Sequence, residues 1–126
     1  MIKLNHTIVY ARDKRISSAF LAELFGLPPP VAFGPFLAVE VHNEVTLDYH
    51  DADEPVASQH YAFLVSDEAF DKIFERIKVR GLPYWADPGH RQPDEINTKD
   101  GGRGVYFDDP SGHVLEIITT PYGVAR

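Results

Sequence analysis

The sequence contains no cysteine, and this absence excludes several kinds of chemistry at once. The 126-residue chain has no disulfide framework, no thiolate metal ligand and no thiol nucleophile. It also lacks an apolar run of the roughly 18–20 residues that a membrane-spanning helix needs. Its first residues lack the apolar stretch of a signal peptide. We therefore expect a cytoplasmic protein that does not bind a membrane.

Clustered positive charge is scarce as well. The net charge of −7 comes from 12 Lys and Arg residues against 19 Asp and Glu residues, which argues against a nucleic-acid partner. The hydrophobic fraction of 44% and charged fraction of 25% are typical of globular proteins. The length suits one domain, residues 1–126, with its own core. These properties favour a protein that acts on a small molecule.

The chain contains a twofold repeat. The segments 5–10 and 59–64 both have a histidine at their second position and apolar residues after it, as in a strand. Each segment is followed by apolar residues at helical spacing, namely Ile16, Phe20 and Leu24 in the first copy and Phe70, Ile73, Phe74 and Ile77 in the second. The sequence therefore predicts a strand followed by an amphipathic helix in each half.

Turn-forming residues mark the ends of these helices. Ser66 is a suitable N-cap for the second helix. Gly26 and Gly81 are each followed by leucine and then proline, so each helix is expected to end at a left-handed glycine.

Further strand patterns complete each half. The first half has Phe36–Val41 and Val45–Tyr49, and the second has Gly104–Phe107 and His113–Thr119. Both halves thus resemble β-α-β-β-β modules.

The first module is expected to cover about residues 1–55 and the second about 56–126, with Asp51–Ala57 as the joint. Between the second helix and the next strand, Asp87–Gly102 is long, polar and rich in Gly, Pro and Asp. Such a loop is expected to be functional or disordered.

Two histidines and one carboxylate lie on strand-like segments that are far apart in the sequence. His6 and His60 lie in the first strand-like segment of each half, and Glu116 lies within the last such segment. Three such ligands hold a divalent metal and leave coordination positions for substrate or water. A buried carboxylate among apolar neighbours needs a compensating partner, and a cation is one. The alternative is that both histidines are ordinary core residues and Glu116 forms a salt bridge.

With its paired modules, its two strand histidines and the segment Val105–Glu116, the chain resembles the vicinal oxygen chelate superfamily. That superfamily includes glyoxalase I, extradiol dioxygenases, fosfomycin-resistance proteins and bleomycin-binding proteins. The resemblance implies an α+β fold in which two βαβββ modules form a cupped mixed sheet. It also implies a divalent metal (Fe, Mn, Zn or Ni) held by His6, His60 and Glu116, which binds neighbouring oxygens of a small substrate. A homodimer is expected, in which the modules pair within one chain or exchange between chains.

The fourth strand bears on the branch of the superfamily. Glyoxalase I places a fourth ligand, a glutamate, on this strand, and Thr46 matches that position best here. Threonine is a poor ligand for such metals. Asp48 or His50 could replace it in another register, although each is more typical of a strand-end surface residue. A three-ligand site of the extradiol type is therefore favoured over the glyoxalase I type.

Tyr106 lies ten residues before Glu116, where extradiol enzymes have a substrate-binding tyrosine. A phenol beside a metal can donate to a bound oxygen or handle a proton, so Tyr106 is the candidate catalytic residue. Its alternative role is that of a core aromatic. The histidine that the extradiol pattern expects nearby is replaced by Asn97-Thr98-Lys99. His50 or His90 could serve in its place.

Two other functions remain open. A fosfomycin-type thiol transferase would need a cationic cradle, for which Arg103 and Lys99 are the candidates on that side. A metal-free, bleomycin-binding type of protein would use aromatic walls such as Trp85 and Tyr84. Among the remaining histidines, His113 alternates away from Glu116 and is expected to be external, and His42 is expected in an exposed turn.

Overall fold

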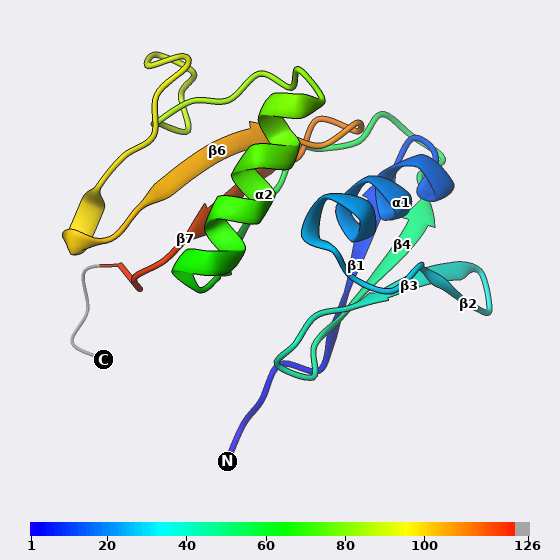
Figure 1. The fold of residues 1–126 in the computed structure, drawn as a ribbon. Helices are drawn as coiled ribbons and strands as arrows, with labels where there is room; N and C mark the ends of the chain where they lie inside the picture. Colours follow the sequence, from blue (N-terminus) through cyan, green and yellow to red (C-terminus); the bar gives the residue numbers. More distant parts are fainter. Residues whose placement is uncertain (123–126) are drawn as a thin grey trace. The chain divides into compact units, whose positions relative to one another are not determined.

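The computed structural model describes residues 1–122, and the chain divides into two compact units, Met1–Ala57 and Ser58–Arg126. Each unit combines one α-helix with one small sheet of parallel and antiparallel strands (Figure 1). The predicted α+β class is therefore confirmed, with two separate sheets. Among residues 1–122, no helix has both the length and the apolar character that crossing a membrane requires.

The first unit contains the complete β-α-β-β-β order. Its elements are β1 (His6–Ala11), α1 (Lys14–Phe25), β2 (Val31–Phe33), β3 (Phe36–Glu40) and β4 (Thr46–Asp51). The strands lie in the order β1-β4-β3-β2, with β1 parallel to β4 and the other pairs antiparallel. The parallel pair requires a long connection, and α1 is part of that connection.

The second unit follows the same plan with one change. Its elements are β5 (His60–Leu64), α2 (Asp67–Val79), a short 3-10 turn (Lys99–Gly101), β6 (Gly104–Asp108) and β7 (Val114–Ile118). The strands lie in the order β5-β7-β6, and β5 is parallel to β7. Two isolated backbone bridges, Trp85 with Tyr106 and Asn97 with Gly104, lie along β6 where the first unit has its β2 strand. The predicted long loop therefore runs along the edge of the sheet.

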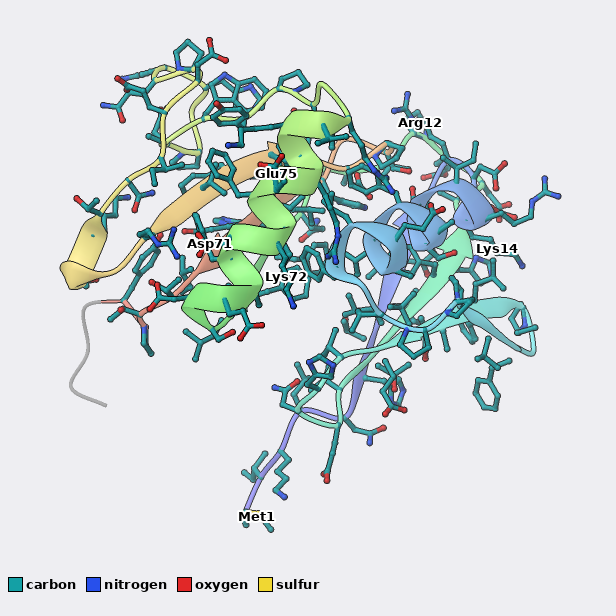
Figure 2. The ribbon with its side chains drawn as sticks, in the orientation of Figure 1. Met1, Arg12, Lys14, Asp71, Lys72 and Glu75 are labelled. Carbon is teal, nitrogen blue, oxygen red and sulfur yellow. The ribbon has the colours of Figure 1, made fainter. Side chains whose placement is uncertain are left out.

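The predicted helix ends are confirmed. Gly26 and Gly81 have positive φ angles of 67° and 65°, which a residue with a Cβ rarely adopts. The Ser66 side chain caps α2 by accepting a hydrogen bond from the backbone N–H of Ala69. The start of α1 is tied to its own sheet, because the backbone N–H of Lys14 (Figure 2) donates to Asp51 at 2.8 Å.

The buried face of α1 differs from the prediction. Ile16 was expected in the core but is exposed, while Leu24 is fully buried as expected. The buried residues of this helix are Ser17, Ser18, Leu21, Ala22 and Leu24. Small side chains can approach a sheet closely, so the helix turns its serines and alanine inward, and a pattern of large apolar residues could not reveal this. In α2 the predicted Phe70, Ile73 and Ile77 are buried.

The prediction for His113 is wrong. Its side chain does alternate away from Glu116, but that face of the sheet is the buried one, and His113 is only 1% exposed. The backbone N–H of Gln59 donates to His113 Nδ1 at 3.0 Å, and the ring lies edge-on to Tyr61. A buried imidazole is tolerated here because its ring nitrogen accepts this hydrogen bond.

Candidate metal centre

In each unit the first strand is more covered on one face, and its more exposed face carries the candidate histidine. On β1, Val9 and Ala11 are buried, whereas His6, Ile8 and Tyr10 are exposed on the opposite face. The predicted alternation along β1 is therefore correct. We call the face that bears the histidine the open face of each unit.

On the open face of the second unit, His60 and Glu116 come together. The register pairs Glu116 on β7 with Ala62 on β5 and with Tyr106 on β6, so these side chains point to the same side. His60 Nε2 lies 2.9 Å from Glu116 Oε1, within hydrogen-bond distance. Glu116 is 1% exposed, while the His60 side chain is 46% exposed. A buried carboxylate thus faces a solvent-accessible imidazole.

This pair fits a divalent metal. Imidazole nitrogen and carboxylate oxygen are ligands that Zn, Fe, Mn and Ni accept. In octahedral coordination, two such atoms, each about 2.1 Å from a metal and at right angles, lie about 3.0 Å from one another. The observed separation of 2.9 Å is close to this value. A cation could therefore take the place of the direct hydrogen bond once the imidazole and the carboxylate turn toward it.

Two tyrosines surround the same carboxylate. Tyr106 is buried beside Glu116, and its ring lies 5.8 Å from that of His60. The Tyr122 hydroxyl donates a hydrogen bond to Glu116 Oε2. Burial raises the pKa of Tyr106, and the hydrogen bond and charge of Glu116 add to this increase. Burial likewise raises the pKa of Tyr122, with further contributions from Glu116 and Tyr106. Both phenols therefore remain protonated donors at neutral pH.

Tyr122 was not among the residues identified from the sequence, because no local pattern points to it. The strand that carries Glu116 ends at Ile118, and the chain bends at Thr119 and Thr120 before it reaches Tyr122. Strand alternation therefore does not extend as far as Tyr122.

Further groups border this face of the second unit. Trp85 pairs with Tyr106 through two backbone hydrogen bonds, and its indole stacks on the His90 ring at 3.6 Å. His90 Nε2 lies 3.4 Å from Asp108 Oδ1. Lys99 Nζ lies 6.0 Å from the ring centre of Tyr106 and 5.6 Å from that of Tyr122. This side of the sheet therefore offers a flat aromatic surface and one cation.

On the open face of the first unit, His6 lies beside a cavity. This cavity has a volume of about 730 Å³ and lies within the first unit, where its lining includes His6, Glu40, His42, Thr46 and Asp48. His6 Nδ1 lies 2.7 Å from Asn5 Oδ1. When Nδ1 carries the proton and donates to this oxygen, Nε2 keeps a lone pair for a metal or another donor.

The register corrects the prediction for the fourth strand. His6 is paired with Thr46 and His60 with Val114, so Thr46 corresponds to Val114 in the repeat. Asp48, two residues further along β4, corresponds to Glu116. Asp48 is 6% exposed and lines the cavity, so it is not the surface residue that was expected.

Other candidates have different roles. The Arg103 side chain donates to two carboxylates of α2, those of Asp67 and Asp71, and lies over Phe70, so it is engaged within its own unit. Tyr84 packs edge-on against Phe74 of α2 at 5.0 Å. These contacts weaken the case for Arg103 in a phosphonate cradle and for Tyr84 in an aromatic wall.

The remaining polar candidates are placed as follows. His42 is exposed, as predicted. His50 lies on the open face of the first unit against Tyr10 and Phe36. Asn97 Nδ2 donates to the Ala86 carbonyl, which fixes the long loop beside β6.

The predicted three-ligand set is brought together only in part. Within residues 1–122, no three His, Asp or Glu side chains form a group close enough to hold a metal. His60 and Glu116 meet in the second unit, and His6 belongs to the first. Participation of His6 therefore remains a prediction.

Comparison with known proteins identifies the class. The model of the Glyoxalase/Bleomycin resistance protein/Dioxygenase superfamily matches residues 3–117, and the chain belongs to this superfamily, also called the vicinal oxygen chelate superfamily. The chain is similar to the solved structures of oxidase ChaP-H1, with 60% identity and a TM-score of 0.96, and of oxidase ChaP-H2, with 58% identity and a TM-score of 0.94. The first match covers 98% of this chain and 100% of that structure, and the second covers 97% and 96%.

The chain is also similar to a curated enzyme of another type. It is 31% identical over 121 residues to glutathione transferase FosA of Serratia marcescens, which covers 90% of this chain and 78% of FosA. The proteins similar to this chain therefore include oxidases and a transferase.

Proposed function

We propose that this protein is a metal-dependent oxidase that binds a small substrate through two neighbouring oxygens. The observation that carries the proposal is the pairing of His60 with the buried Glu116 on the open face of the second unit. The 60% identity to oxidase ChaP-H1 over nearly the whole chain supports oxidation as the reaction type.

In this proposal His6, His60 and Glu116 hold one divalent cation, which is Fe, Mn, Zn or Ni. The cation would supply Lewis-acid chemistry to the substrate oxygens and, if it is iron, access to dioxygen chemistry. The two imidazoles contribute neutral ligands and Glu116 contributes the single negative charge. Three protein ligands leave positions free for a substrate that binds through two atoms.

Tyr106 is the proposed catalytic residue. Its hydroxyl lies beside Glu116 and remains protonated, so it can donate a hydrogen bond to a substrate oxygen and stabilise negative charge that develops there. The stacked Trp85 and His90 rings lie on the same side of the sheet and can orient a flat substrate. As in the sequence-based prediction, the enzyme is expected to be a cytoplasmic homodimer.

Metal analysis and calorimetry test the proposal. Purified protein is freed of metal and titrated under anaerobic conditions with Fe(II), Mn(II), Zn(II) and Ni(II). We expect one strong site for at least one of these metals in the wild type and a loss of that site in His60→Ala. Lys72→Ala, which removes an exposed side chain of α2, is the control and should bind like the wild type. Equal, negligible binding in all three proteins contradicts the proposal.

Oxygen consumption then tests the reaction type. A panel of aromatic compounds with hydroxyl or carbonyl groups on neighbouring carbons is mixed with the loaded enzyme in an oxygen electrode. We expect at least one compound to cause uptake that Tyr106→Phe reduces about 100-fold or more.

A second candidate, thiol transfer, is favoured by the 31% identity to glutathione transferase FosA. Incubating the loaded enzyme with glutathione and fosfomycin separates the two candidates. An adduct without oxygen uptake would support thiol transfer, whereas the proposal expects no adduct. The engagement of Arg103 with Asp67 and Asp71 argues for the latter result.

A further inference from the structure

The two oxygens of Glu116 face different groups. Oε1 lies 2.9 Å from His60 Nε2, on the side where the proposed cation binds. Oε2 accepts a hydrogen bond from the hydroxyl of Tyr122, six residues further along the chain. Because Glu116 is only 1% exposed, solvent cannot readily replace this donor. The orientation of the carboxylate therefore depends on the segment that follows β7.

That segment is fixed by contacts with the start of β6. The backbone N–H of Thr119 donates to the Arg103 carbonyl at 2.9 Å, and the backbone N–H of Arg103 donates to Thr119 Oγ1 at 2.8 Å. Gly102 lies against the same segment, where an added Cβ would be 2.7 Å from Thr120 Cβ. Only glycine allows so close an approach. These contacts direct the chain back, so that Tyr122 lies over Glu116.

We propose that Tyr122 is a positioning residue for the metal-ligating carboxylate. By holding Oε2, its hydroxyl presents Oε1 to the cation in a fixed orientation. Groups that hydrogen-bond a ligand in this way commonly set its geometry and contribute to metal affinity. The inference rests on the proposed function, and it adds a residue that lies outside the three predicted ligands and Tyr106.

Tyr122→Phe tests this role because it removes one oxygen and keeps the ring. We expect the dissociation constant for Zn(II), measured by competition with a chelator, to rise about 10- to 100-fold. The visible spectrum of the Co(II)-loaded protein should change as well, because the carboxylate is no longer held. Tyr84→Phe is the matched control, since Tyr84 packs on Phe74, and it should leave both measurements unchanged.

A second variant, Gly102→Ala, addresses the same contact without changing a tyrosine. Its Cβ displaces Thr120, so we expect Tyr122 to lose its place and Zn(II) to bind more weakly, as in Tyr122→Phe. Thermal unfolding of every variant separates a general loss of structure from a change at the metal.

The outcomes distinguish this inference from the proposed function. If the wild type binds Zn(II), and Tyr122→Phe has the same dissociation constant and Co(II) spectrum, the role of Tyr122 is overturned and the metal site stands. A wild type that binds no divalent metal overturns both.

Discussion

The two units share a scaffold but differ at the centre of their open faces. In the first unit, Asp48 has Ile8 and Ala38 as its strand neighbours. In the second unit, Glu116 has Tyr106 on one side and accepts a hydrogen bond from Tyr122. A repeated framework therefore places one carboxylate at the same position twice, and within residues 1–122 it is the second copy that has tyrosine hydroxyls beside it.

The largest expected effect on metal affinity is a difference between these two carboxylates when each is neutralised in turn. Glu116→Gln removes the only charged ligand in the proposed site, and we expect Zn(II) affinity to fall at least about 100-fold, or about 2.7 kcal/mol. Asp48→Asn should change the affinity less than about tenfold, because the proposed site has three ligands. Calorimetry measures both. Equal losses would instead indicate a four-ligand site that includes Asp48.

The next comparison uses the two faces of β6. Phe107 is fully buried, so Phe107→Ala should destabilise the protein by about 3–5 kcal/mol. Tyr106→Phe keeps the buried ring and should cost less than about 1.5 kcal/mol. Urea unfolding gives both values. A Tyr106→Phe variant as unstable as Phe107→Ala would show that Tyr106 is mainly a core residue.

A smaller effect is expected from Asn5→Ala in the first unit. Without the amide oxygen at 2.7 Å, His6 no longer has a neighbour that fixes its protonated nitrogen. Zn(II) affinity should fall about tenfold. Asn43→Ala, in the exposed turn between β3 and β4, is the control and should bind normally. If both variants bind like the wild type, His6 is not held by Asn5.

The smallest effects concern the two helix caps, and they differ in pH dependence. Ser66→Ala should cost about 1 kcal/mol at both neutral and acidic pH, because a hydroxyl does not titrate. The backbone N–H of Arg15 lowers the pKa of Asp13, so this cap stabilises the fold above the usual carboxyl pKa and loses its effect as the pH falls through the lowered value.

Urea unfolding of Asp13→Ala near pH 7 and about pH 3 checks this difference. The substitution should destabilise the protein near pH 7 and should destabilise it less at the acidic pH, where part of the Asp13 charge is lost. An effect that is equal at both pH values would show that the Asp13 charge does not contribute.

Features that depend on neighbouring residues could be predicted from the sequence. The left-handed Gly26 and Gly81, the Ser66 cap and the strands around the His42 turn follow from local backbone preferences. The face of each strand that carries its ligand follows from alternation. Helix burial was harder, because exposed Ile16 and buried Ser17 depend on how closely α1 approaches its sheet.

Features that depend on register and on contacts distant in sequence were missed. Thr46 was chosen as the match to the fourth ligand, although Leu47-Asp48 resembles Leu115-Glu116 and could have given the correct alignment. The burial of His113 depends on which face of its sheet is covered. Tyr122 reaches Glu116 only because the chain turns back past Gly102.

Counting the imidazole ligands of a bound metal tests the central claim most directly. Electron spin echo envelope modulation of the Cu(II)-loaded protein detects the nitrogen of each coordinated histidine. We predict two coordinated imidazoles in the wild type and one in either His6→Ala or His60→Ala. A wild-type spectrum without imidazole nitrogen, or one that His60→Ala leaves unchanged, would contradict the account.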